Sequence, residues 1–255
     1  DMNFQLAEFM DCEFEDPIDQ HLALLCIQTA FAATIKLTAY RVLMQKQRRE
    51  MDFHGISNYK LKDFYVKLRE IDSGQEFPNF PNLMEEDTFT WYTNEEFKDK
   101  DIAESLRAII VELARFQPVI IQVGEESRIN DLFHKFYMKL MPSKVRHSLG
   151  EYFTPGWLAE HVIESGMQQL NVSVGRNWKA LDPTCGSGTF LQAIVTRIMN
   201  QDHLKKKPEL IRREVLNRVH GFDLNPISVL AARVNLYLAL ESLSNDPLKG
   251  CEIPV

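Results

Sequence analysis

The sequence predicts an all-helical N-terminal domain followed by an α/β domain built on a parallel sheet. Apolar residues recur at helical spacing through much of residues 19–141, and no strand pattern stands out before residue 119. After residue 149, short strand-like runs alternate with helical runs, which is typical of parallel strands joined by helices. At 255 residues the chain is long enough for two modest domains, each with its own core.

The longest predicted helix covers residues 19–49, which contain neither Gly nor Pro. Leu24, Ile27, Phe31 and Ile35 recur on one side, and a second side is apolar as well. A helix that is apolar on most faces is either a core helix or a membrane span. Because Lys36 lies inside this run and a lysine within a membrane is costly, we expect a core helix and no membrane association.

Three more helices are predicted before residue 142, and residues 72–100 between them are irregular. Asp101 and Pro118 mark the start and the end of one helix, and Pro142 closes the last. A short apolar run at residues 119–123 is ambiguous. The predicted helices cover residues 60–71, 101–117 and 127–141. We expect a helical domain at 1–141, a polar and basic linker at 142–148, and the α/β domain at 149–255.

In the second domain, residues 178–182 and 219–223 are the predicted strands. Helices are predicted at residues 155–170, 189–200 and 226–243. Residues 201–218 separate the two strands further than usual and contain Lys205-Lys206-Lys207 and Arg212-Arg213. Because charge runs are usually solvated faces, we interpret this stretch as a helical insertion on the surface. A role in contacting DNA is the alternative.

The distribution of charge and the cysteine content argue against an N-terminal half that binds nucleic acid and against a zinc or disulfide framework. Residues 1–143 carry 16 Lys and Arg against 25 Asp and Glu, whereas residues 144–255 carry 13 against 11. An acidic N-terminal half matches a phosphate backbone poorly. The four cysteines are not spaced as zinc ligands or as a disulfide framework, no metal ligands or nuclease constellation are identified, and no signal peptide is recognised. These features predict a reduced, cytoplasmic protein.

The first candidate binding segment follows the first predicted strand and reads Asp182-Pro183-Thr184-Cys185-Gly186-Ser187-Gly188-Thr189-Phe190. Glycines between a strand and a helix allow the backbone to approach a ligand closely. A phosphate-binding loop usually carries a lysine, and this loop has none. The strand ends in a carboxylate, which repels a pyrophosphate and suits a ligand with an amino group and a sulfonium. We therefore expect the ligand to be S-adenosylmethionine.

The second segment reads Gly221-Phe222-Asp223-Leu224-Asn225-Pro226 and follows the second predicted strand. An acidic residue at this position is placed to accept both ribose hydroxyls of a nucleoside. Asp223 lies 41 residues after Asp182, about twice the usual interval. We assign Asp223 and its neighbour Leu224 to the cofactor site.

The third segment reads Leu149-Gly150-Glu151-Tyr152-Phe153-Thr154-Pro155. We expect Thr154 to cap the helix at 155–170 and Pro155 to be its first residue. The free N–H groups of such a helix start suit the carboxylate of the ligand, and Tyr152 and Phe153 can pack on its methionine or adenine part. Each of the three segments alone also fits an ordinary turn, surface acid or helix start, so their order along the chain carries the argument.

Together the three segments resemble the amino-methylating DNA methyltransferases, especially the adenine-specific modification enzymes of restriction systems. Residues 151–155 are similar to that family's N-terminal cofactor motif, residues 182–190 to its glycine motif, and residues 221–226 to its ribose-binding acid. The order of the motifs resembles type I modification subunits and fused restriction–modification enzymes. The resemblance covers residues 149–240. It implies the first part of a Rossmann-like, S-adenosylmethionine-dependent methyltransferase domain, with DNA as substrate and restriction or specificity subunits as possible partners.

The sequence departs from the family at the catalytic motif. The family transfers the methyl group with a tetrapeptide of Asn, Asp or Ser, then Pro-Pro, then an aromatic residue that stacks on a flipped base. That tetrapeptide does not occur here, and Asn225-Pro226-Ile227 lacks the second proline and the aromatic ring. We therefore assign no catalytic residue, expect the tetrapeptide beyond Val255, and expect the fragment to be inactive alone. A methyltransferase acting on RNA or on protein glutamine, and a helical interaction module, remain the alternatives.

Overall fold

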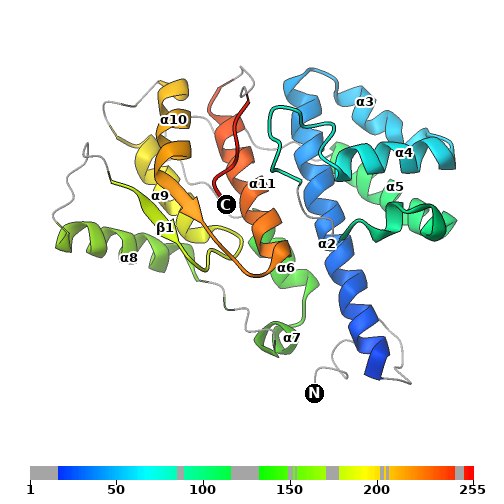
Figure 1. Cartoon of the computed structure of the whole chain (residues 1–255), viewed down its shortest axis with the longest axis horizontal. Helices are drawn as coiled ribbons and strands as arrows, with labels where there is room; N and C mark the ends of the chain where they lie inside the picture. The colour runs from blue at the N-terminus through cyan, green and yellow to red at the C-terminus, as the bar shows by residue number, and fades with distance from the viewer. Residues whose placement is uncertain are drawn as a thin grey trace.

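The computed structural model describes residues 17–84, 89–115, 132–148, 152, 154–170, 178–201, 204, 207–244 and 250–255. Two long helices, α2 (Pro17–Lys46) and α11 (Pro226–Ser242), pack side by side through the middle of the molecule (Figure 1). The other N-terminal helices lie on one side of this pair, and a small parallel sheet with its helices lies on the other. The described residues are mostly helical, as the sequence predicts.

The N-terminal helices surround α2. Helices α3 (Glu50–Gly55), α4 (Leu61–Asp72) and α5 (Lys100–Arg115) each pack against it. Short 3-10 helices follow at η1 (Ile56–Asn58), η3 (Trp91–Thr93) and η4 (Glu95–Phe97). The predicted run at 119–123, and part of the predicted helix at 127–141, lie outside the described residues.

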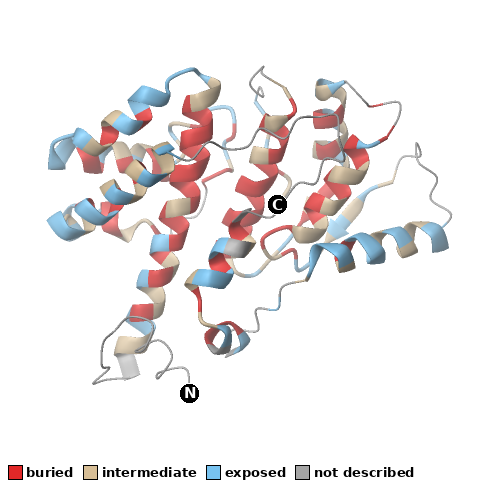
Figure 2. Cartoon of the chain, turned by 180° about the vertical axis from the view of Figure 1, so that it is seen from behind, coloured by how far each residue is buried: buried red, intermediate tan, exposed pale blue. Residues whose placement is uncertain are grey.

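Helix α2 is a core helix in this structure. Its residues 19–46 are long and apolar enough to cross a membrane by length and composition, yet 61% of the most apolar window is buried inside the protein. Figure 2 shows the buried residues running along α2 and α11. Lys36 is 1% exposed and its ammonium lies 3.6 Å from the buried carboxylate of Asp72. The charge that argued against a membrane span is therefore paired in the protein interior.

Most of the predicted linker at 142–148 is helical. After α6 (Leu132–Leu140), residues Ser143–Ser148 form a short helix, α7. Val145 and Arg146 are buried, and Arg146 Nε donates to the carbonyl of Met141 at 3.2 Å. The polar composition of this stretch therefore did not indicate that Val145 and Arg146 are buried.

The predicted parallel pairing of the strands is confirmed. Strands β1 (Ala180–Asp182) and β2 (Val219–Gly221) pair in parallel, with Asp182 opposite Gly221. Both strands are shorter than predicted. Helices α9 (Thr189–Met199) and α10 (Pro208–Arg218) follow β1 and lead into β2, and α8 (Gly156–Gln169) packs on α9.

Gly221 shows which face of the sheet meets α9. A Cβ atom at this position would lie 2.8 Å from Leu191 Cδ1 and 3.1 Å from Cys185 Sγ, so only glycine fits without repacking. Gly221 and its partner Asp182 therefore belong to the covered face. Leu181 and His220 belong to the opposite face, where Leu181 is 58% exposed.

The polar stretch before β2 is not a purely superficial insertion. Helix α10 buries Ile211, Val215 and Arg212, the last being 2% exposed. Arg212 Nε donates to the Leu240 carbonyl at 3.0 Å, and its Nη1 lies 2.7 Å from Glu209. The neighbouring Arg213 side chain is 66% exposed, so one residue of the arginine pair lies in the core and the other in solvent.

Candidate cofactor-binding site

The carboxyl ends of β1 and β2 meet at one edge of the sheet. The Phe222 N–H donates to the Asp182 carbonyl at 2.8 Å, and the Cys185 N–H donates to the Phe222 carbonyl at 2.8 Å. These bonds extend the strand pairing into the two loops. Asp182 and Asp223, which the sequence placed at the ends of separate strands, are thereby brought to the same edge.

The loop between β1 and α9 turns through two glycines in the left-handed region. Gly186 has φ +55° and Gly188 has φ +94°, a conformation that side-chain-bearing residues rarely adopt. A Cβ on Gly188 would lie 3.5 Å from Ala232 Cβ, so the loop packs directly on α11 there. Apart from its two chain neighbours, no described residue has an atom within 4 Å of a Cβ built on Gly186. The backbone at Gly186 therefore borders open space that a ligand could enter.

Asp223 holds this loop in place. One carboxylate oxygen accepts the Gly186 N–H at 2.8 Å, and the other accepts the Asn225 N–H at 2.8 Å. Asp223 therefore joins the glycine loop to the loop after β2. Since a carboxylate oxygen can accept more than one hydrogen bond, Asp223 keeps acceptor capacity for a ligand.

The carboxylate of Asp182 lies in an unfavourable electrostatic environment. Its Oδ1 accepts the Thr184 N–H at 3.1 Å, while its buried Oδ2 has no hydrogen-bond partner among the described residues. Burial raises the pKa of Asp182 above its ordinary value; the Thr184 N–H opposes this rise, and the charge of Asp223 adds to it. A cation bound near the two carboxylates would relieve the repulsion between them. The residues present therefore fit a ligand that carries positive charge.

Cys185 takes no part as a nucleophile. Its side chain is 5% exposed, and burial together with the charges of Asp223 and Asp182 raises its pKa to about 12. Only the thiolate is strongly nucleophilic, and this cysteine stays protonated at neutral pH. Its side chain packs behind the loop, against the position of Gly221.

Two asparagines that the sequence analysis did not assign to the site support it from α11. Asn235, which is 4% exposed, donates from Nδ2 to the Ser187 carbonyl at 2.9 Å. Asn225 caps α11, because its side-chain oxygen accepts the Ile227 N–H at 3.0 Å. The signal for Asn235 was its position within a largely apolar helix, where a buried amide needs a partner.

The third predicted segment starts its helix differently from the prediction. The N-cap is Pro155 and the first helical residue is Gly156, so Thr154 is not the cap and Pro155 is not helical. The Pro155 carbonyl accepts the Leu158 and Ala159 N–H groups at 2.9 and 3.1 Å. Proline fits because the N-cap lies in the extended region, with φ −60° and ψ 140°.

The remaining predicted site residues differ in their surroundings. Tyr152 is 75% exposed and stacks on His147, with ring centroids 5.4 Å apart. Leu224 is fully exposed. Glu151 and Phe153 lie outside the described residues. The structure thus brings together Asp182, the loop at 183–188 and Asp223.

Comparisons with known proteins identify a family model and two relatives that resemble parts of this chain. Residues 128–245 match the sequence model of the family described as N-6 DNA Methylase. The chain is 32% identical over 95 residues to the adenine-specific methyltransferase PglX of Streptomyces coelicolor, a match that covers 36% of this chain and 8% of the relative. It is 24% identical over 282 aligned positions to a putative type II restriction enzyme and methyltransferase of Methanocaldococcus jannaschii, covering 88% of this chain and 22% of the relative.

The chain therefore spans less than a quarter of the length of either relative. No solved structure matches it. The resemblance predicted from residues 149–240 is confirmed: residues 128–245 are similar to the N-6 DNA Methylase family, and the two relatives are named as an adenine-specific methyltransferase and as a putative type II restriction enzyme and methyltransferase.

Proposed function

We propose that this chain is the S-adenosylmethionine-binding portion of an adenine-N6 DNA methyltransferase from a restriction–modification system. The observation that carries the proposal is the meeting of two carboxylates at the ends of adjacent parallel strands, around a glycine loop that contains no lysine. The family match and the names of the relatives support the reaction class. In this proposal the two strands are the start of a Rossmann-like sheet, which binds its ligand at the carboxyl ends of the strands.

Each of the proposed residues would contact a different part of the ligand. Asp182 would attract the amino group through its negative charge. The open side of Gly186 would allow the nucleoside to lie against the loop backbone. Asp223 would accept the ribose hydroxyls while still holding the loop. The start of α8, with Tyr152 and Phe153, would face the carboxylate and methionine end.

When bound, S-adenosylmethionine would supply an electrophilic methyl group. The described residues bind and orient; they do not activate the adenine amine. We propose that the Pro-Pro tetrapeptide and the target-recognition residues belong to chain segments other than these 255 residues, and that this chain alone does not methylate DNA. Its partners would then be DNA, held mostly by those other segments, together with restriction or specificity subunits, in the cytoplasm.

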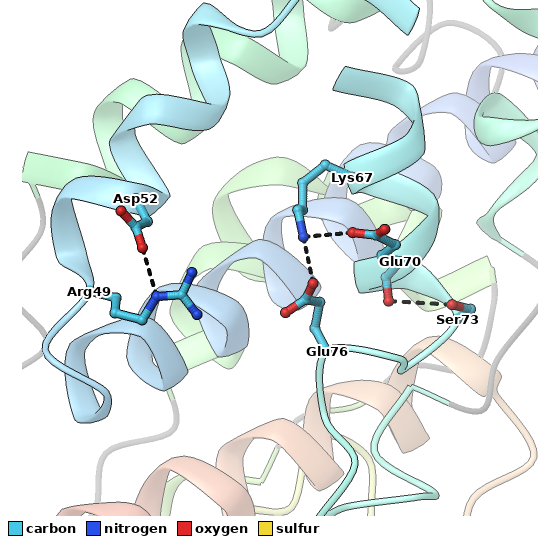
Figure 3. A network of polar contacts seen from close by, with 6 residues as sticks. All are labelled: Arg49, Asp52, Lys67, Glu70, Ser73 and Glu76. Carbon is cyan, nitrogen blue, oxygen red and sulfur yellow. Dashed lines mark hydrogen bonds and ion pairs between the residues drawn. The ribbon is translucent and has the colours of Figure 1, made fainter. Parts of the chain in front are cut away.

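Calorimetry with S-adenosylmethionine tests the proposal directly. The chain should bind it, and Asp223→Ala should weaken binding by about 1.5–3 kcal/mol, the usual value of a charge-assisted hydrogen bond. Asp52→Ala is the matched control, because Asp52 is exposed and pairs with Arg49 at 2.6 Å (Figure 3). Circular dichroism should show that both variants remain folded.

Tighter binding of NAD or ATP than of S-adenosylmethionine would contradict the proposal, as would the absence of any binding. Methylation of unmethylated DNA by the 255 residues alone would contradict the placement of the catalytic tetrapeptide elsewhere. A chain that binds no nucleoside, yet retains a partner through its N-terminal helices, would favour the helical interaction module.

A further inference from the structure

The segment at residues 251–255 lies along β2, on the edge away from β1. The Gly221 N–H donates to the Pro254 carbonyl at 2.9 Å, whereas the next N–H, that of Phe222, donates toward β1. Ile253 is 1% exposed. Strand β2 is therefore held on both edges, and the bond from Gly221 is made two residues before Asp223.

A loop from the N-terminal half of the chain reaches this segment. The loop covers residues 77–84 and follows α4. At its start, the Lys67 ammonium lies 2.6 Å from Glu70 and 2.5 Å from Glu76, which ties the turn back to α4 (Figure 3). Further along, Phe80 packs edge-on against Tyr237 of α11, with ring centroids 4.9 Å apart. The loop is thus fixed at one end to the helical part and in its middle to α11.

Asn82 in this loop hydrogen-bonds to the segment through both polar atoms of its side-chain amide. Its Nδ2 donates to the Ile253 carbonyl at 2.7 Å, and its Oδ1 accepts the Ile253 N–H at 2.9 Å. The pair of bonds is the one that a neighbouring strand would make with this residue. The Asn79 main-chain carbonyl adds a third bond, from the Cys251 N–H at 2.9 Å. A side chain that satisfies one residue's donor and acceptor together must itself carry both, as an amide does.

We propose that Asn82 is a positioning residue for the cofactor site, and that it acts by fixing residues 251–255 against β2. The inference rests on the proposed function, because the site it positions is the one assigned there. Two strands of three residues form a sheet that is marginal without further support. Residues 251–255 support β2 on its second edge, and Asn82 makes with Ile253 the hydrogen bonds that a further strand would make. Through Gly221, this order reaches Asp223 and the glycine loop that Asp223 holds.

Two variants and two controls test the inference. Asn82→Leu keeps the size of the side chain and removes both bonds, whereas Asn82→Asp keeps the acceptor and places a negative charge against the Ile253 carbonyl. Asn79→Ala is the matched control, because the Asn79 side chain is exposed and its hydrogen bond with Cys251 uses the main-chain carbonyl. Phe53→Leu is a second control; it loosens the buried core of the N-terminal helices without touching the segment.

Hydrogen–deuterium exchange of the unliganded chain is the first readout. Both Asn82 variants should speed exchange in peptides covering residues 251–255 by on the order of tenfold, since each loses at least one hydrogen bond that orders the segment. Residues 219–223 should exchange faster as well. Asn79→Ala should leave both regions unchanged.

Affinity for S-adenosylmethionine is the second readout. Asn82→Leu should weaken binding about three- to tenfold, while Asn79→Ala and Phe53→Leu should bind like the unmodified chain at a temperature where all are folded. A purely structural role would lower the melting temperature of Asn82→Leu and of Phe53→Leu without separating their affinities. Unchanged exchange at residues 251–255, or equal affinity in Asn82→Leu and Phe53→Leu, would overturn the inference.

The two proposals fail separately. If the unmodified chain does not bind S-adenosylmethionine, the proposed function is wrong, and the exchange data alone then decide whether Asn82 orders the segment. If the unmodified chain binds and Asn82→Leu binds equally well, the proposed function stands and the positioning role is wrong.

Discussion

Replacement of Asp182 by Asn separates the binding role of this carboxylate from its role in the fold. The substitution keeps the size of the side chain and an oxygen for the Thr184 N–H, and it removes the charge. We expect Asp182→Asn to bind S-adenosylmethionine about ten- to a hundredfold more weakly, which corresponds to about 1.5–3 kcal/mol for a hydrogen bond between charged groups. We also expect the unliganded variant to be more stable than the unmodified chain at neutral pH.

The second expectation follows from the direction of the pKa shift. Burial and the neighbouring Asp223 raise the pKa of Asp182 in the folded chain above its value in the unfolded chain. The folded state then binds this proton more tightly, so the contribution of Asp182 to stability is lost as pH rises from the unfolded pKa through the folded pKa. At neutral pH the ionised group opposes folding, and asparagine removes that opposition.

Calorimetry across pH 4–7 and urea unfolding at pH 7 measure the two effects. Affinity for the cationic ligand should fall as pH falls through the raised pKa of Asp182, by at most about tenfold per pH unit, because the protonated carboxyl no longer attracts the ligand. Asp182→Asn should lack this dependence. Asp52→Asn, at an exposed surface pair, is the control for a general charge effect.

Equal affinity in Asp182→Asn and the unmodified chain would refute the electrostatic argument for the cofactor site. An unchanged pH profile would do the same, since it would place the titrating group elsewhere. Loss of stability in the variant at pH 7 would mean that the buried carboxylate has a favourable partner, contrary to the unsatisfied oxygen seen here.

Two predictions concern the fold around the site. Gly188→Ala should lower the free energy of unfolding by about 1–2 kcal/mol, because its φ of +94° is strained for alanine although the added Cβ meets Ala232 at an ordinary 3.5 Å; urea unfolding measures this, and an unchanged midpoint would contradict it. Arg212→Ala should lower the free energy of unfolding by about 3–5 kcal/mol, because it leaves the buried Glu241 short of a compensating charge. The control Arg213→Ala, at an exposed side chain, should change it by less than about 0.5 kcal/mol. Equal losses in the two variants would show that Arg212 is not needed in the core.

Local patterns in the sequence were sufficient to place the elements that build the site. The helical periodicity of α4, α5 and α9 predicted their positions to within a few residues, since each of these helices buries one face against the core. Helix α2 was predicted from its long apolar run without Gly or Pro, and it is buried on most faces. The turn with Gly186 and Gly188 was visible because only glycine adopts its backbone angles readily. The parallel pairing of β1 and β2 followed from the helices between them, and that pairing alone brings Asp182 and Asp223 together.

The tertiary structure decided the features that depend on contacts between distant residues. Asn235 and Asn82 are ordinary amides in the sequence, and their roles arise from backbone groups 48 and 171 residues away. Arg212 and Arg213 read as one solvated charge run until α10 packed one of them against α11. The sequence by itself determined which segments form the long helices and the two strands, and where the glycine turn lies between them, because those properties are local. The tertiary structure decided which polar side chains hold that loop and its strand in place. A buried amide or charge needs a hydrogen-bond partner, and only the fold determines which distant residue supplies it.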